Sequence, residues 1–232
     1  MIVVLPIVII GLFAIMKASN ALTDISKEQV ANVAVKLADM TQVALSKELK
    51  LLKELSIEQT IVETAARVGT HKPEDSATDF EKVSKHLSAV MKQIGSEYEE
   101  IIVVSPEGVV LADGSDGKSK GINVTDRDYF KAAKDGRVTI GTVIKSRKTG
   151  NPVVPMGAPI LGESGEFVGS LAIIANIDFL LEKVAGAKTG KTGYAFMVDG
   201  DGRFIAHPRR ELVFEGNVKN FKGMEAVVSG ML

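Results

Sequence analysis

The chain opens with an apolar run, residues 2–16, that is followed by Lys17. No polar residue interrupts any face of this run, which favours a membrane-spanning helix over a buried core helix. A span takes about 17 to 25 apolar residues, so the run is at the short limit. No basic residue precedes it and no clear A-x-A cleavage site follows it, so a signal peptide is the weaker interpretation. The pattern predicts a membrane anchor over residues 1–18.

Apolar residues then recur in alternating steps of three and four, which is the spacing of one helix face. Residues 19–68 contain no proline, so the pattern predicts one long stalk helix that first meets a partner helix and then lies on a globular domain. Gly69 and Pro73 are expected to end this helix, and a second helix is predicted over about 76–95. The stripe that would meet the partner consists of Val30, Val33, Leu37, Met40 and Ala44.

Beyond residue 95 the pattern changes to that of strands. Apolar runs at 101–104 and 109–113 flank a Ser-Pro-Glu-Gly turn, which predicts a β-hairpin. Long helices followed by an antiparallel sheet with a helix in one crossover are typical of an α+β domain. The further predicted elements are strands at 138–146, 152–161 and 167–177 and short helices at 126–136 and 178–184.

The hairpin pattern returns near the end of the chain. AFMVDGDGRFIAH, residues 195–207, repeats the order of strand, Gly-containing turn and strand seen in IIVVSPEGVVLAD, residues 101–113. The sequence ends at Leu232, just after a possible helix at 224–231 and before further strands could close a second sheet. We therefore expect two copies of one module, a complete one over residues 69–185 and the incomplete start of another over residues 186–232.

Composition removes several classes of function. With 28 basic and 29 acidic residues the net charge is −1, which gives no bias toward nucleic acid. The absence of cysteine excludes disulfides, thiol catalysis and thiolate metal sites. The three histidines, His71, His86 and His207, have neither metal-ligand nor triad spacing. We predict no catalytic residue, no metal and no cofactor, and hence no enzymatic activity in this chain.

Two segments match a relaxed phosphate-loop pattern, Ala185 to Thr192 and Ala112 to Ser119. Both lack the first glycine of that pattern. A phosphate loop also needs a strand before its turn and a helix after it. The first match follows a predicted helix and precedes a predicted strand, and no helix is predicted to start at Lys118. Both segments are therefore interpreted as solvated loops rather than as a nucleotide site.

Candidate chemistry gathers in the segment DRDYF, residues 126–130. If a helix starts at Asp126, Phe130 shares a face with Asp126 and Arg127, and Tyr129 lies close by. Such a cluster offers a guanidinium for a carboxylate, an aromatic wall and a hydroxyl. From local spacing alone, the favoured interpretation is still an N-capped helix in which Arg127 pairs with a neighbouring acid and both aromatics fill the core.

Taken together, four segments resemble the extracytoplasmic double Cache (dCache) sensor domain of bacterial chemoreceptors, histidine kinases and diguanylate cyclases. The resemblance implies two PAS-like modules, with a membrane-distal one at 69–185 and a membrane-proximal one from 186. It also implies a receptor of the inner membrane whose residues from about 19 onward are periplasmic, and a homodimer through the N-terminal helix. The segments are DRDYFKAA at 126–133, VIKSRKTGNPVVPMGAPIL at 143–161, GSLAIIANIDFLLEKV at 169–184 and TGYAFMVDGDGRFIAHP at 192–208.

In this family the distal module usually holds a small ligand between the DRDYF-type helix and the central strands. Arg127 matches the carboxylate-binding arginine of the amino-acid-binding subset. Tyr129 stands where that subset has Trp, Phe130 lacks the expected hydroxyl, and Ile122 replaces an earlier Tyr. The resemblance implies these ligand-binding residues: Asp126, Arg127, Tyr129, Phe130, Lys145, Met156 and, for a ligand amine, Asn176 or Asp178.

Because the amine half of the pattern is weakened, we expect a small carboxylate without an amine. An amino-acid ligand is the alternative. A structural dimerisation module without any ligand is a third interpretation.

Overall fold

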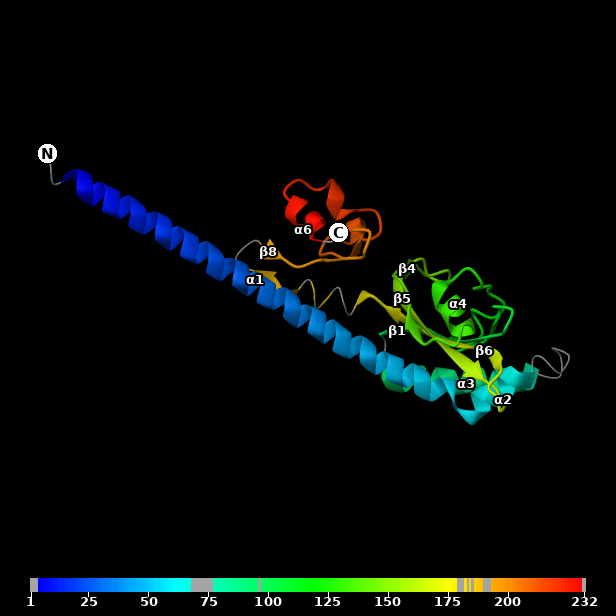
Figure 1. Ribbon diagram of the computed structural model, residues 1–232. Coiled ribbons are helices and arrows are strands. Elements are labelled where there is room, and N and C mark those ends of the chain that lie inside the picture. Colours follow the sequence, from blue (N-terminus) through cyan, green and yellow to red (C-terminus); the bar gives the residue numbers. More distant parts are fainter. Residues whose placement is uncertain are drawn as a thin grey trace.

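The structure is a computed structural model that describes residues 4–67, 77–95, 97–178, 182, 184, 186–189 and 193–230. A helix of 53 residues, α1 (Val4–Ser56), runs past the rest of the fold and extends well beyond it at the N-terminal end (Figure 1). Among the described residues, no helix is long and apolar enough to cross a membrane. Part of the anchor predicted over residues 1–18 lies outside the described residues, and the anchor stays a prediction.

The helix predicted over residues 19–68 is divided in two, because α2 (Gln59–Arg67) starts after a break at residues 57–58. The sequence contains no helix breaker here. The turn lets α2 bury Ile61 and Ala65 against the sheet, and this burial outweighs local helix propensity. The helix end expected at Gly69 and Pro73 lies outside the described residues. The second predicted helix is present as α3 (Ala77–Ile94).

A six-stranded antiparallel sheet follows, in the order β2-β1-β6-β5-β3, with β4 also paired to β5. The predicted hairpin is confirmed as β1 and β2. The strand predicted over residues 138–146 is interrupted, because residues 141–143 do not continue the strand between β3 and β4. The strands are β1 (Tyr98–Val104), β2 (Val110–Asp113), β3 (Thr139–Ile140), β4 (Ile144–Lys145), β5 (Pro152–Leu161) and β6 (Phe167–Asn176).

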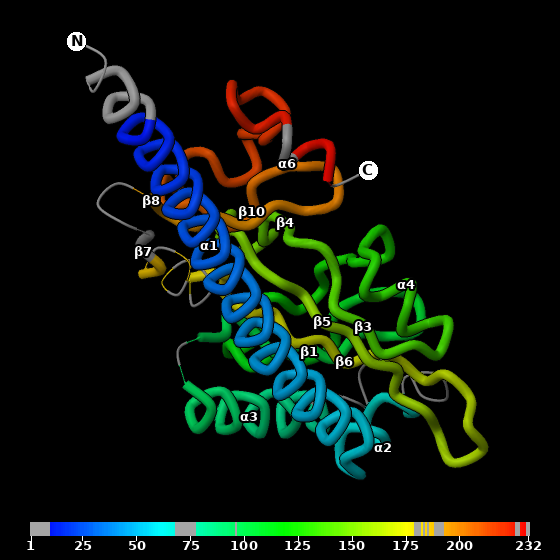
Figure 2. Tube along the Cα trace, turned by 60° about the vertical axis from the view of Figure 1, so that its left-hand side comes forward, coloured from blue at the N-terminus to red at the C-terminus, as the bar shows by residue number. Residues whose placement is uncertain are grey.

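The two faces of the sheet are covered differently. Helices α1, α2 and α3 lie on one face, and α4 (Asp128–Lys134) lies on the other with the loops that precede it (Figure 2). Alternation along β5 sends Met156 to the three helices and Val153 to the side of α4. This order of long helices and antiparallel sheet confirms the α+β fold with a PAS-like module.

Two of the prolines of strand β5, Pro155 and Pro159, lie where its backbone faces the outer edge of the sheet. The carbonyl of Pro155 accepts from the backbone N–H of Gly141 at 2.7 Å, on the side away from β6. Pro159 has the same parity, so the N–H that it lacks would also have pointed outward. No described strand pairs with residues 158–161 on that side, and proline is tolerated there because no ladder bond is lost.

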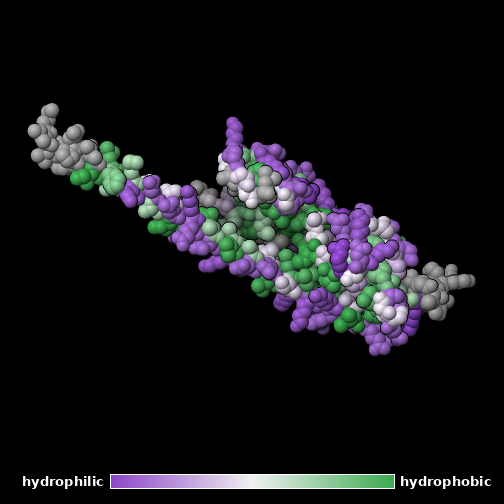
Figure 3. Space-filling view, in the orientation of Figure 1, coloured by the Kyte–Doolittle hydropathy of each residue, from purple (hydrophilic) through white to green (hydrophobic). Residues whose placement is uncertain are grey.

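A second, smaller unit follows residue 186. Its predicted hairpin is present as β9 and β10, while the division into two copies of one module stays a prediction. An apolar cluster that includes Val154, Ala206 and Val213 joins this unit to the sheet. Apolar residues gather where α1, the sheet and this unit meet (Figure 3). Its elements are β7 (Lys188–Thr189), β8 (Gly193–Tyr194), β9 (Met197–Val198), β10 (Phe204–Ala206), the 3-10 turns η1 (Arg210–Leu212) and η2 (Val218–Asn220), and α6 (Glu225–Ser229).

In the residues that the structure describes, neither phosphate-loop match has the local structure of such a site. In the first, Ala185 and residues 190–192 lie outside the described residues, and β7 and β8 pair as two short strands around them. In the second, no helix begins at Lys118, and backbone N–H groups of the loop bond to the carboxylate of Asp113. Most of the helix predicted at 178–184 also lies outside the described residues.

The buried His207 makes the second unit sensitive to acid. Burial lowers the pKa of His207, and its Nδ1 accepts from the backbone N–H of Arg209 at 2.9 Å, so the neutral ring is favoured. Because the unfolded chain protonates first, the stability contribution is present above pH about 6.5 and is lost as the pH falls from there toward the folded value. We expect thermal midpoints measured from pH 8 to pH 5 to fall more steeply for this chain than for His207→Asn. Equal slopes would contradict this prediction.

Candidate functional site

A small cavity of about 50 Å³ lies between α4 and the sheet. Its apolar walls come from β1, β2, β4, β5, β6 and the loop before α4. Its polar lining includes side chains of both signs of charge. The apolar lining consists of Ile102, Val110, Ile122, Val124, Ile144, Val153 and Ile174, and the polar lining of Glu99, Glu100, Ser119, Arg127, Tyr129, Ser146, Arg147 and Lys148.

A β-bulge in β1 places two acids on this cavity. Tyr98 pairs with Ala175 and Glu100 with Ile174, so Glu99 is an extra residue on β1. The bulge interrupts the alternation of side chains. Tyr98 therefore packs on the helical face of the sheet, while Glu99 and Glu100 both line the cavity on the opposite face.

Glu100 is only 4% exposed and is fully provided with partners. Its carboxylate accepts from the hydroxyl of Ser119 at 2.6 Å and from that of Ser115, and it lies 3.4 Å from the ammonium of Lys148. Since buried carboxylates need such partners, this network fixes one wall of the cavity. Glu99 accepts from the hydroxyls of Ser146 and Thr149, and no described residue forms an ion pair with it.

Asp113 organises the loop behind Glu100. Its carboxylate accepts from the backbone N–H groups of Ser115, Gly117 and Ser119 at 2.8, 2.9 and 3.0 Å. Burial acts to raise the pKa of Asp113, but these donors outweigh it and the pKa is lowered. The loop is thereby closed around an internal anion, and its two serines are held under Glu100.

Among the described basic residues that line the cavity, Arg127 is the one that forms no ion pair with an acidic side chain. Its guanidinium donates to the carbonyl of Lys145 at 3.4 Å, and within the described residues it makes no ion pair. Arg147, in contrast, pairs with Asp126 at 2.6 Å. A half-buried guanidinium with free donors is suited to a bidentate carboxylate.

Tyr129 supplies a second free donor. The residue is 3% exposed and lines the cavity, and its hydroxyl has no hydrogen-bond partner among the described residues. Burial raises the pKa of Tyr129 to about 12 against the positive charges of Arg127 and Arg147, so the hydroxyl keeps its proton. A second cavity of about 90 Å³ lies on the other side of Arg127 and Tyr129, near Gly141 and Pro155.

The start of α4 differs from the helix predicted over residues 126–136. Arg127, and not Asp126, is the N-cap residue, and no side chain caps the helix. The carboxylate of Asp126 is instead taken by Arg147. Burial acts to raise the pKa of Asp126, but the hydrogen bond from Arg147 and the backbone donor outweigh it and the pKa is lowered. Asp126 lines the second cavity only.

The other predicted binding residues lie apart from the cavity. Phe130 is buried in the apolar cluster beneath α4, and Met156 is fully buried on the helical face of the sheet. Lys145 reaches Arg127 through its carbonyl, while its ammonium lies 3.3 Å from Glu215 of the second unit. Asp178 pairs with Arg210 at 3.0 Å, and Asn176 ends β6 without lining the cavity in the described part of the chain.

Sequence reasoning missed Glu99, Glu100, Arg147 and Lys148. Two adjacent acids at the start of an apolar strand, YEEIIVV, were a usable signal, because buried strand positions rarely hold unpaired charges. The bulge that turns both to one face leaves no mark in the sequence pattern. The arrangement can hold a small anion at Arg127 and Tyr129 and a cationic group at Glu99.

Known proteins share this fold. This chain is 23% identical over 209 residues to the methyl-accepting chemotaxis protein TlpB of Bacillus subtilis. The match covers 89% of this chain and 29% of TlpB. The chain thus spans less than a third of that relative. Among solved structures, the V. cholerae histidine kinase DctB sensor domain aligns with a TM-score of 0.69 at 13% identity, over 81% of this chain and 68% of that one.

A second structure, the ligand-binding domain of the Pseudomonas fluorescens chemoreceptor CtaA in complex with L-serine, aligns with a TM-score of 0.56 at 21% identity. It covers 79% of this chain and 72% of that one. The Cache domain family dCache_1 matches residues 18–230, which confirms the double Cache resemblance. The chain therefore belongs to the Cache domain family, the extracytoplasmic ligand-binding sensor domains of bacterial receptors.

Proposed function

We propose that this chain is the sensing part of a bacterial transmembrane signalling receptor and that its distal module binds a small carboxylate through Arg127. The observation that carries the proposal is the pair of free donors on one cavity, the unpaired guanidinium of Arg127 and the unpartnered hydroxyl of Tyr129. A carboxylate would satisfy both with charge-assisted hydrogen bonds. The cavity is far smaller than the roughly 300–1,000 Å³ of most ligand pockets, so the ligand is small and the site widens to admit it.

An amino acid is the second candidate, and Glu99 favours it. This carboxylate lines the same cavity as Arg127 and has hydroxyl partners but no cation among the described residues. An ammonium group at Glu99 and a carboxylate at Arg127 would neutralise both charges. The similar CtaA domain was solved with L-serine. Glu99 in the β1 bulge would then bind the ligand amine, in place of Asn176 or Asp178.

Signalling would proceed through α1. A ligand shifts the balance between two conformations only by its different affinity for them, and about 1–3 kcal/mol changes output several-fold or more. We propose an inner-membrane anchor before residue 19, periplasmic modules after it, and a homodimer along α1. Val30 and Met40 of the predicted contact stripe are about half exposed, at 48% and 51%, which leaves them available to a partner helix. The output of the whole protein, chemotaxis, kinase or cyclase, follows from segments beyond this chain.

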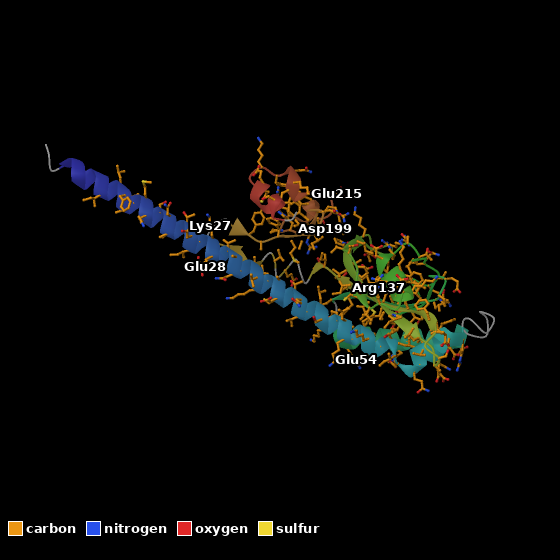
Figure 4. All side chains as sticks on the ribbon, in the orientation of Figure 1. Lys27, Glu28, Glu54, Arg137, Asp199 and Glu215 are labelled. Carbon is orange, nitrogen blue, oxygen red and sulfur yellow. The ribbon has the colours of Figure 1, made fainter. Side chains whose placement is uncertain are left out.

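Ligand-induced thermal stabilisation tests the site. We expect organic acids or amino acids at about 100 times their Kd to stabilise the chain by about 2.7 kcal/mol, and Arg127→Ala to abolish that gain. Arg137→Ala is the matched control, because Arg137 is an exposed arginine near the end of α4 that pairs with Asp135 (Figure 4). Comparing stabilisation by organic acids that lack an amine with stabilisation by amino acids separates the two candidates. Stabilisation that persists in Arg127→Ala would overturn the assignment, and no stabilisation by any compound favours a structural module.

A further inference from the structure

One hydrogen bond ties the long helix to the strand that carries the cavity glutamates. The hydroxyl of Tyr98 on β1 donates to the carboxylate of Glu48 on α1, across 50 positions of sequence. Burial raises the pKa of Tyr98 above its usual range, and the bond to Glu48 raises it further, so the phenol keeps its proton. Among the described residues this is the only side-chain hydrogen bond between α1 and the sheet.

The remaining contacts of α1 with the sheet are apolar. Leu49, Leu52 and Leu55 pack into the cluster that the sheet and the helices share. Apolar burial is non-directional, so such contacts resist separation but oppose small sliding movements weakly. A hydrogen bond has a preferred length and angle. The bond from Tyr98 to Glu48 therefore fixes the position of α1 along the sheet more sharply than the leucines do.

The same strand turns toward the cavity immediately after Tyr98. Because Glu99 is the extra residue of the bulge, Tyr98 faces α1 while Glu99 and Glu100 face the ligand cavity. A displacement at the bulge reaches both neighbours directly, since one planar peptide joins Tyr98 to Glu99. Bulges are local irregularities that re-aim side chains, and this one joins two faces of the sheet.

We propose that Tyr98 is the coupling residue of the sensor and that its bond to Glu48 carries displacements of Glu99 and Glu100 to α1. This inference rests on the proposed function for its biological meaning, because the displacement would come from a ligand in the cavity. The coupling itself is a property of the apo chain. It can be measured without any ligand.

The test is a double-mutant cycle read by hydrogen–deuterium exchange of the amides around Glu48. Glu99→Gln weakens the hold of the bulge on Ser146 and Thr149. Tyr98→Phe removes only the hydroxyl and keeps the ring. We expect Glu99→Gln to change exchange in α1 by about 2- to 10-fold when Tyr98 is present, as for one net hydrogen bond, and to leave it unchanged in Tyr98→Phe.

Three further variants test whether the coupling runs through this bond. Glu48→Gln keeps an acceptor for the Tyr98 hydroxyl and should retain the coupling. Glu48→Ala removes the acceptor on α1 and should abolish the coupling. Glu54→Gln, at an exposed glutamate of the same helix that pairs with Lys50, should leave the coupling intact (Figure 4). The same change in exchange with and without the Tyr98 hydroxyl would overturn the proposal, as would loss of coupling in Glu54→Gln.

Failure of this inference and failure of the proposed function are distinguishable. If the Arg127 site binds its ligand but the exchange effects of Glu99→Gln and Tyr98→Phe simply add, the site stands and the coupling role of Tyr98 is wrong. If no ligand stabilises the chain but the effects are coupled, the role of Tyr98 stands as a mechanical property of the fold.

Discussion

Replacing Asp113 with alanine is expected to lower the free energy of unfolding by about 3 kcal/mol or more. The fully buried carboxylate is the acceptor for three backbone N–H groups of its loop, and the substitution leaves all three without a partner. Because the pKa of Asp113 is held below its ordinary value, the contribution is fully present above pH about 4 and is lost as the pH falls through the lowered pKa. Urea unfolding at pH 7 measures the loss.

Asp24→Ala provides the control for this experiment, since Asp24 is an exposed aspartate on α1. It should change stability by less than about 0.5 kcal/mol. Asp113→Asn should fall between the two, because an amide keeps one acceptor oxygen but loses the charge. A loss in Asp113→Ala no larger than in Asp24→Ala would show that the loop does not depend on this anion.

The second large effect is expected for Gly157→Ala, at about 1–3 kcal/mol of lost stability. A Cβ at Gly157 would lie 2.6 Å from the backbone oxygen of Tyr129, so α4 must move away from β5. The contact is with backbone, which cannot rotate out of the way as a side chain could. Because the first turn of α4 carries Tyr129, any ligand that stabilises the unmodified chain should also bind more weakly in the variant.

Gly200→Ala is the matched control, because a Cβ there meets nothing within 4 Å. It should be neutral or slightly stabilising, since alanine reduces the freedom of the unfolded chain. Thermal unfolding of both variants gives the comparison. If Gly157→Ala is as stable as Gly200→Ala, the close packing of α4 on β5 is not a feature of the protein in solution.

Periodicity predicted the helices and strands that are determined by the apolar face of their own sequence. The stripes of α3, the β1–β2 hairpin and the long strand β5 all bury a regular set of side chains, so their pattern is visible without tertiary information. The break after Ser56 is different. It occurs where the sequence has neither glycine nor proline, and the burial of Ile61 and Ala65 against the sheet explains it.

The candidate site was predicted in part for the same reason. Arg127 and Tyr129 stand in a compact motif, whereas Phe130 and Met156 have side chains that the fold turns into apolar clusters. Strict alternation would put Glu99 and Glu100 on opposite faces. One inserted residue puts them together, and such register shifts depend on pairing with β6, which a single strand does not encode.

A proline at the open edge of β5 bears on how copies of this domain behave when they are crowded together. In the proposed receptor, copies that stand side by side in a membrane would hold their sheets at high local concentration, where an open edge could be continued by the neighbouring molecule. At Pro159 the outward donor is absent, so a second chain finds no N–H there to begin a ladder. The edge at Pro159 can thus stay uncovered without seeding a sheet shared between molecules.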